Sequence, residues 1–206
     1  MYSIHLTTLV FLFSACLWAQ DRMPPIPKDK MTPAQLKSFE AVSATRGPAG
    51  ATGPFVPLLR SPEFMDRIQA VGEYIRFHNS LPQKLVEMTI LMTSRHFTQQ
   101  YEWDSHYPLA MKAGLKPEIA AAIAAGRRPD AMAEDEDMMH NFVTELLQNK
   151  SVSDHSYGRM LAKFGEQGAI DAAGTVGYYT TIGLVLNVAR SASDSGGKVP
   201  PLARIP

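Results

Sequence analysis

The stretch LVEMTILMTSRHFTQQYEWDSHYPLAMKA, from Leu85 to Ala113, decides the fold that we predict for this chain. Its first half is an almost wholly apolar helical run that contains one carboxylate, Glu87. A polar break at 96–99 follows, and a second helix then carries Glu102 and His106, four residues apart. Residues at this spacing lie on one face of a helix, one turn apart. Two acids and an imidazole beside an apolar element are the components of general acid–base chemistry or of a metal site.

The same residues also have a purely structural explanation. Glu87 can pair with Lys84 on a solvated edge, and Glu102 and His106 can form an ordinary i,i+4 pair on a helix surface. A lone carboxylate buried in an apolar helix is costly unless it is paired or protonated. If Glu87 points inward, we therefore expect its partner to be the Glu102–His106 face of the following helix.

The start of the chain has the character of an export signal. Residues 1–19 contain no Lys, Arg, Asp or Glu, and their apolar core at 9–13 is too short to span a bilayer but suits the h-region of a secretory signal. We expect cleavage after Ala19, which leaves Gln20 first and gives a periplasmic or secreted protein. The alternative is lipoprotein processing at Cys16.

Cysteine content and charge exclude several classes of function. Cys16 is the only cysteine, so a mature chain that starts at Gln20 has no disulfide, no thiolate nucleophile and no Cys-ligated metal. The chain carries 20 basic and 20 acidic residues, a balance that argues against a nucleic-acid partner and against polybasic membrane binding. The mature length suits one domain with a proper core.

Outside the central stretch the chain predicts further helices and no strand, since no segment alternates with period two for long enough. Ser/Thr–Pro pairs at 32–33 and 61–62 mark two helix starts, and the second helix carries apolar residues at helical spacing, Phe64, Ile68, Val71 and Ile75. The segment 47–57 is too rich in Gly and Pro for a helix or strand, which predicts a loop. The sequence therefore predicts one all-α domain of about seven helices.

The segment 166–190 is long and apolar enough to raise the question of a membrane span. Asp171, Asn187 and the cluster 178–181 instead favour a buried core helix, separate from an amphipathic helix at 152–164. We therefore expect no membrane span in the mature chain. The Ser-, Gly- and Pro-rich residues 191–206 predict a flexible tail that is either loose or laid on a partner subunit.

Several motifs occur together in a characteristic order. They are GPFVPLLRSPEF at 53–64, Leu85-x-Glu87, QYEW-x-x-H at 100–106, A-x-x-AGL at 110–115 and GYYTTIGLVLN at 177–187. This pattern resembles the carboxymuconolactone decarboxylase and alkylhydroperoxidase D family, over most of residues 50–190. With the resemblance, the chain divides into a signal peptide (1–19), a proline-rich segment with one short helix (20–48), a decarboxylase-like helical domain (49–190) and the tail (191–206).

The resemblance implies an alkylhydroperoxidase D-like helical bundle that forms a homo-oligomer, a trimer or a hexamer, with its site near a subunit interface. The peroxidase branch of the family uses a glutamate, a C-x-x-C pair and a histidine. When His106 is placed on that histidine, Gln99 and Glu102 fall on the two cysteines and Glu87 falls on the glutamate. A thiol peroxidase needs its thiolates, so the missing sulfurs exclude that cycle.

The remaining residues are more similar to those of the decarboxylase branch. The resemblance then implies proton transfer at a carbon next to a carbonyl, in a small carboxylate or lactone and without a cofactor. In this interpretation His106 exchanges the proton, and Glu102 orients the imidazole or shares its proton. Glu87, if buried, has a raised pKa.

Four neighbouring residues are candidates for binding the substrate. Tyr101 and Trp103 are expected to line an apolar pocket, Arg95 to hold a carboxylate, and Gln99 to lie beside them. The structural alternatives place Trp103 in the core and Arg95 in a surface ion pair.

Two other classes of function stay open. Glu87, Glu102 and His106 match the ligand types of a catalytic site for a divalent metal. Alternatively, the protein is an exported, non-catalytic oligomer that binds small carboxylates without turnover.

Overall fold

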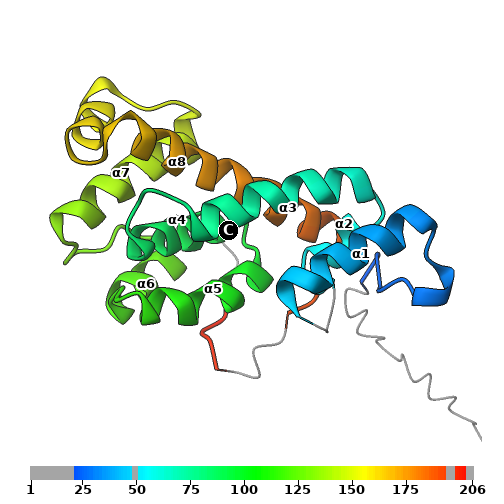
Figure 1. The fold of residues 1–206 in the computed structure, drawn as a ribbon. Helices are drawn as coiled ribbons and strands as arrows, with labels where there is room; N and C mark the ends of the chain where they lie inside the picture. The colour runs from blue at the N-terminus through cyan, green and yellow to red at the C-terminus, as the bar shows by residue number, and fades with distance from the viewer. Residues whose placement is uncertain (1–20, 48–50, 194–197, 203–206) are drawn as a thin grey trace, which may run out of the picture.

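The computed structural model describes residues 21–47, 51–193 and 198–202. The predicted signal peptide, Cys16 and the cleavage site before Gln20 lie outside these residues. Every regular element of the described chain is helical, which confirms the predicted all-α class (Figure 1). The elements are the 3-10 turn η1 (Lys28–Lys30), α1 (Pro33–Arg46), α2 (Phe55–Leu58), α3 (Pro62–Phe77), α4 (Gln83–His96), α5 (Gln100–Lys112), α6 (Pro117–Ala124), α7 (Glu134–Asn149) and α8 (Asp154–Ala189).

Helix α4 lies at the centre of the bundle. It packs against α5, α6, α7 and α8, and every residue from 85 to 95 is buried. A helix that is surrounded on all sides must also satisfy its polar side chains internally. The hydroxyls of Thr89, Thr93 and Ser94 do so by donating to the carbonyl oxygen four residues earlier, each at 2.8 Å. The apolar run predicted at the start of the central stretch is thus the core of the fold.

A tight reversal at 97–99 folds α5 back along α4. Thr98 adopts a left-handed backbone conformation with φ 48°, and the Gln99 side chain caps α5 by accepting a hydrogen bond from the Tyr101 backbone N–H at 2.6 Å. Asn187 of α8 stabilises this turn through two hydrogen bonds. Its side chain donates to the Phe97 carbonyl oxygen at 3.0 Å and accepts from the Gln99 side chain at 3.1 Å. The reversal sets which face of α5 meets α4.

The N-terminal helices follow the sequence signals with two differences. Thr32 and Gln35 form a capping box at the start of α1, as the Thr-Pro pair predicts. Ser61 precedes α3 but makes no side-chain capping bond. The segment 47–57, predicted as a loop, contains the start of the short helix α2, because the burial of Phe55 and Leu58 outweighs the local Gly and Pro content. At this end of the molecule α1 and α2 lie beside α3 (Figure 1).

Helix α3 buries only part of the face that its apolar spacing suggests. Ile75 of that face is buried, but Phe64 and Val71 are 42% and 46% exposed, and Met65 and Gly72 are buried beside Ile75. Gly72 is packed directly under Tyr178 of α8, so that a Cβ atom there would come within 2.2 Å of the tyrosine oxygen. Close approach of the two helices therefore selects the small residue rather than the large apolar ones.

Helix α8 consists of two helical segments joined at Gly165. This glycine has φ 67° and ψ −177°, a non-helical conformation that L-residues rarely adopt. The break agrees with the two helices predicted at 152–164 and 166–190. The second segment runs through the core, where Tyr178, Tyr179 and Leu186 are buried. Among the described helices, none combines the length and apolarity that a bilayer crossing requires.

The described part of the tail packs against α5 instead of staying loose. Val199 and Leu202 are buried, the indole N–H of Trp103 donates to the Pro200 carbonyl oxygen at 3.1 Å, and the Leu202 backbone N–H donates to the Gln100 side chain at 2.8 Å. The prediction of a flexible tail is therefore corrected for residues 198–202. Two apolar side chains and an otherwise unsatisfied indole N–H are enough to dock this short segment.

Candidate functional site

Glu87 and His106 meet in the interior between α4 and α5. They are 2% and 5% exposed, and Oε2 of Glu87 lies 2.8 Å from Nδ1 of His106. The other carboxylate oxygen of Glu87 accepts a hydrogen bond from the Gln83 side chain at 2.7 Å. Lys84 does not pair with Glu87, because it forms ion pairs with Asp135 and Glu136 of α7. The interior arrangement expected for Glu87 is thus the one that the fold provides.

The opposite nitrogen of the imidazole faces Glu102 and Tyr179. Nε2 of His106 lies 3.2 Å from the Tyr179 hydroxyl and 3.6 Å from Oε2 of Glu102. The rings of His106 and Tyr179 also pack edge to face, with centroids 5.0 Å apart. A carboxylate at Nδ1 accepts the Nδ1–H proton, which leaves the lone pair of the neutral imidazole on Nε2. The Tyr179 hydroxyl can then donate to that lone pair.

Burial controls the protonation of Glu102. This carboxyl is 4% exposed, and desolvation raises its pKa above the ordinary value of 4.5. His106, Arg76 and Arg46 each lower the same pKa, in that order, but burial is the largest effect. A carboxyl with a raised pKa is suited to giving and taking a proton near neutral pH.

The two tyrosines of α8 that line the cavity stay protonated. Burial raises the pKa of Tyr178 to about 12 and that of Tyr179 well above its ordinary value of 10.0. Their rings pack edge to face at 5.0 Å. Tyr179 is consequently a fixed hydroxyl donor beside Nε2 and not a titrating base.

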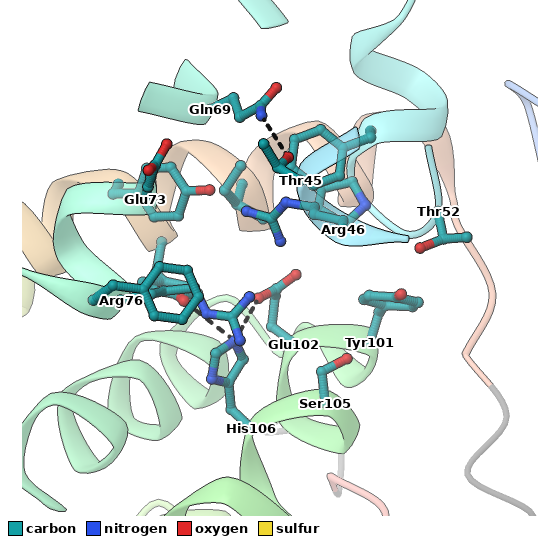
Figure 2. Close-up of a pocket in the computed structure, with 16 residues that line it drawn as sticks. Thr45, Arg46, Thr52, Gln69, Glu73, Arg76, Tyr101, Glu102, Ser105 and His106 are labelled. Carbon is teal, nitrogen blue, oxygen red and sulfur yellow. Dashed lines mark hydrogen bonds and ion pairs between the residues drawn. The ribbon is translucent and has the colours of Figure 1, made fainter. Parts of the chain in front are cut away.

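These groups open onto a cavity of about 630 Å³ (Figure 2). His106, Glu102, Tyr179 and Ser105 form part of its wall, whereas Glu87 lies behind the imidazole and does not line it. Two guanidinium groups also line the cavity, Arg46 from the end of α1 and Arg76 from the end of α3, and both interact electrostatically with Glu102. Figure 2 shows both guanidinium groups pointing toward the Glu102 carboxyl. The cavity thus places positive charge beside an acid–base pair.

The remaining predicted site residues divide into those at the cavity and those away from it. Tyr101 lines the cavity, and its ring rests on Gly53, where a Cβ atom would come within 2.3 Å of the tyrosine oxygen. Gln99 is occupied in capping α5, and Trp103 is fully buried in the core. Arg95 lies on another face of α4 and lines a second, separate cavity. The structure therefore does not bring Gln99, Trp103 or Arg95 to His106.

Several residues of the cavity wall are absent from the predicted site, and Arg46, Arg76 and Tyr179 are those used in the chemical argument below. Each comes from a helix outside the central stretch, so its proximity to His106 depends on how α1, α3 and α8 pack. The only local signal was the polar Tyr178-Tyr179 pair within an apolar helix, which the sequence interpretation assigned to the core. Both tyrosines are buried, but both also reach the cavity.

The donor geometry does not suit the metal alternative. The two carboxylates approach opposite nitrogens of one imidazole, so a single ion cannot contact Glu87, Glu102 and His106 together. Among the described residues, no group of three His, Cys, Asp or Glu side chains is arranged around a common ion position.

Comparison with known proteins connects this site with a family. Residues 62–136, from the start of α3 to the start of α7, match the model of the carboxymuconolactone decarboxylase family. The matched segment contains Glu87, Glu102 and His106. No curated protein matches the chain significantly.

A solved structure shares the fold over most of its length. It is the alkylhydroperoxidase AhpD core of an uncharacterized peroxidase-related protein from Ralstonia eutropha JMP134. It superposes with a TM-score of 0.67 at 15% sequence identity, covering 84% of this chain and 92% of that one. At this identity the similarity supports the helical architecture alone.

Proposed function

Since the segment 62–136 belongs to the carboxymuconolactone decarboxylase family, we propose that the protein is an acid–base enzyme that moves a proton to or from a carbon next to a carbonyl, in a small carboxylate or lactone. The observation that carries this proposal is the His106 imidazole, which is held by Glu87 at Nδ1 and presents Nε2 to the cavity beside Glu102 and Tyr179.

In the proposed reaction Nε2 of His106 is the general base. Removal of a proton from carbon turns the imidazole into an imidazolium, which the buried carboxylate of Glu87 stabilises across the 2.8 Å contact. The electron pair left on the substrate moves onto the carbonyl oxygen, where the Tyr179 hydroxyl is a suitable donor. The imidazolium then returns its proton to the substrate, or protonated Glu102 does so and is afterwards reprotonated by the imidazolium. Either way the starting protonation is restored and the cycle needs no redox partner.

Substrate charge is recognised by Arg46 and Arg76 in this proposal. Both line the cavity that contains His106, and a guanidinium can bind a carboxylate through two parallel hydrogen bonds. These two arginines take the role that the sequence interpretation gave to Arg95. A substrate carboxylate between them would lie close to Glu102, which favours the protonated form of that acid.

Other activities are less well supported by the same residues. A thiol peroxidase cycle would need the two cysteines whose positions Gln99 and Glu102 occupy. Metal-assisted chemistry would need ligands that converge on one point, and the carboxylates here flank the imidazole. The non-catalytic alternative, a binding protein, differs from the proposal only in turnover.

The experiment that tests the proposal follows proton exchange at carbon directly. Small lactone carboxylates and oxo acids are incubated with the protein in D₂O, and loss of the C–H signal next to the carbonyl is followed by proton NMR. The wild type should accelerate exchange for at least one compound, and His106→Gln should abolish the acceleration. The matched control is His155→Gln, at an exposed histidine of α8. If compounds bind but none of them exchanges its proton faster, the proposed enzymatic activity is contradicted and the non-catalytic binding role is favoured.

We further propose that the protein acts as a homo-oligomer. Support comes from exposed apolar side chains along one face of α8, where Ile170, Leu184 and Val188 are 71%, 48% and 57% exposed. Light scattering on the purified protein gives the mass of the particle in solution, and a monomeric mass would contradict the proposal.

A further inference from the structure

A second cavity of about 390 Å³ lies on the other side of α4, between the end of that helix, the loop after α6 and one face of α7. Its basic side chains are Arg95, His96, Arg127, Arg128 and His140. No Asp or Glu is among the described residues that line it. Burial lowers the pKa of both histidines and favours their neutral form, so the positive charge comes from the arginines. A concave surface with an excess of positive charge attracts anions.

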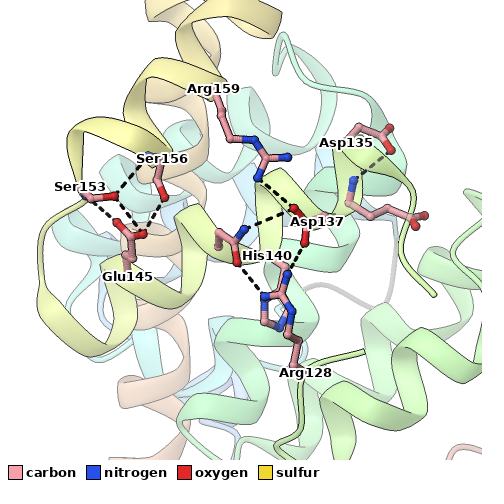
Figure 3. A network of polar contacts seen from close by, with 10 residues as sticks. Arg128, Asp135, Asp137, His140, Glu145, Ser153, Ser156 and Arg159 are labelled. Atoms are coloured by element: carbon pink, nitrogen blue, oxygen red, sulfur yellow. Dashed lines mark hydrogen bonds and ion pairs between the residues drawn. The ribbon is translucent and has the colours of Figure 1, made fainter. Parts of the chain in front are cut away.

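One arginine of this cavity is already neutralised in part. Arg128 forms an ion pair with Asp137 of α7, which also pairs with Arg159 of α8 at 2.9 Å (Figure 3). Arg128 further donates to Asn141 at 2.7 Å and contacts Nδ1 of His140 at 3.3 Å. These bonds hold the guanidinium in place at the cavity, so that it is preorganised for a ligand.

Arg127, next in the chain, is in a different situation. It is exposed at the mouth of the cavity, and its backbone N–H donates to the Ala122 carbonyl oxygen at 2.9 Å. Among the described residues no carboxylate forms an ion pair with its guanidinium. A single Asp137 thus faces two arginines, Arg128 and Arg159, while Arg127 adds a further cation at the rim. Positive charge therefore exceeds negative charge at this edge of the cavity.

The interior of the cavity is apolar. Met92 from α4, Ile123 from α6 and Leu147 from α7 line it, and Thr144 and Gln148 add neutral polar groups. An inorganic anion would use the cations but leave this apolar surface in contact with water. A ligand with a carbon body would use both.

We propose that this second cavity binds a small organic anion, with its carboxylate between Arg127 and Arg128 and its apolar body against Met92, Ile123 and Leu147. The basic side chains and the apolar lining of this cavity are separate from the acid–base site. The His106 cavity is formed by other helices and is lined by different arginines. The second cavity is independent of the proposed function.

Benzoate tests the proposal, with acetate as the probe that lacks an apolar body. Binding is followed by chemical-shift changes of backbone amides, including those of Arg127 and Thr144, in the Arg76→Gln background that weakens anion binding in the first cavity. Benzoate should shift these amides at lower concentration than acetate. Arg127→Gln should weaken benzoate binding by about tenfold, the loss expected for one charge-assisted hydrogen bond.

The matched control is Arg67→Gln, which removes an exposed arginine of α3 that pairs only with Glu63 among the described residues. It should leave benzoate binding unchanged. Equal losses in the two variants, equal affinities for benzoate and acetate, or shifts confined to residues around His106 would each overturn the proposal. Because Arg127 is exposed, its substitution is compatible with folding, which a thermal melt verifies.

Discussion

At the scale of single residues, the site depends on an imidazole that has a different partner on each nitrogen. Glu87 holds Nδ1 from behind, and only Nε2 faces the cavity. Such an arrangement separates two tasks, since one carboxylate sets the tautomer and the charge of the ring while the exposed nitrogen meets the substrate. The two tasks can be separated by mutation.

The first prediction concerns Glu87→Gln. The amide oxygen can still accept the Nδ1–H proton, so the tautomer is kept, but the imidazolium loses its charged partner. We expect kcat to fall about 10- to 100-fold, corresponding to roughly 1.5–3 kcal/mol for a hydrogen bond to a charged group. KM should hardly change because Glu87 does not line the cavity. A rise in KM with unchanged kcat would show that Glu87 acts on substrate binding.

The second prediction concerns the pH dependence of stability through Glu102. Its pKa is raised in the folded protein, above the ordinary value of 4.5, mainly by burial. The folded state therefore binds more protons than the unfolded state, and this contribution to the free energy of unfolding is full below pH 4.5 and is lost as pH rises through the folded pKa. Glu102→Gln, which cannot ionise, should remove this loss.

Urea unfolding of the wild type and of Glu102→Gln, measured from acid to neutral pH, checks this prediction. The stability of the variant relative to the wild type should increase with pH across that window. Parallel profiles would mean that the carboxyl has the same pKa folded and unfolded.

At the scale of elements, the contact between α3 and α8 decides the shape of the cavity. It brings Arg76 at the end of α3 and Tyr179 of α8 into the wall of one cavity. The contact depends on Gly72, which leaves room for the Tyr178 ring. A larger residue at that position has to push the ring or the helix away.

The third prediction compares two glycine substitutions in these helices. Gly72→Ala should destabilise the protein by about 1–3 kcal/mol, because the added Cβ atom would lie 2.2 Å from the Tyr178 oxygen. Gly174→Ala is the matched control, since the nearest atom to its Cβ would be Ile75 Cδ1 at 3.9 Å. That change should be neutral or stabilising by up to about 1 kcal/mol, owing to the better helix propensity of Ala. Denaturant unfolding measures both, and equal effects would contradict the packing argument.

At the scale of the whole molecule, the sequence predicted the elements better than it predicted their mutual arrangement. The Glu87, Glu102 and His106 set was accessible because two helices joined by a short turn carry it. Arg46 and Arg76 could not be predicted from the sequence, because they reach the cavity from helices whose positions depend on packing over the entire chain. Arg95 was misplaced for a related reason. When α4 is buried on all sides, its apolar pattern does not reveal which residue faces which cavity.

The fourth prediction concerns export, which rests on the charge-free apolar stretch at 1–19. Protein recovered from its native host should have the intact mass of a chain that begins at Gln20. A mass that retains Met1, or one that carries a lipid adduct on Cys16, would contradict a cleaved secretory signal.

The position of Arg46 at the last residue of α1 links recognition to local opening. Helix α1 packs mainly against α3 and buries only Ser38 and Val42, so it has the least support of the longer helices. If Arg46 binds a substrate carboxylate together with Arg76, every transient detachment of α1 removes one of the two guanidinium groups from the cavity. By linkage, a bound substrate must suppress that detachment. The amides of α1, remote from the reacting atoms, would then be the ones whose hydrogen exchange slows most when the cavity fills.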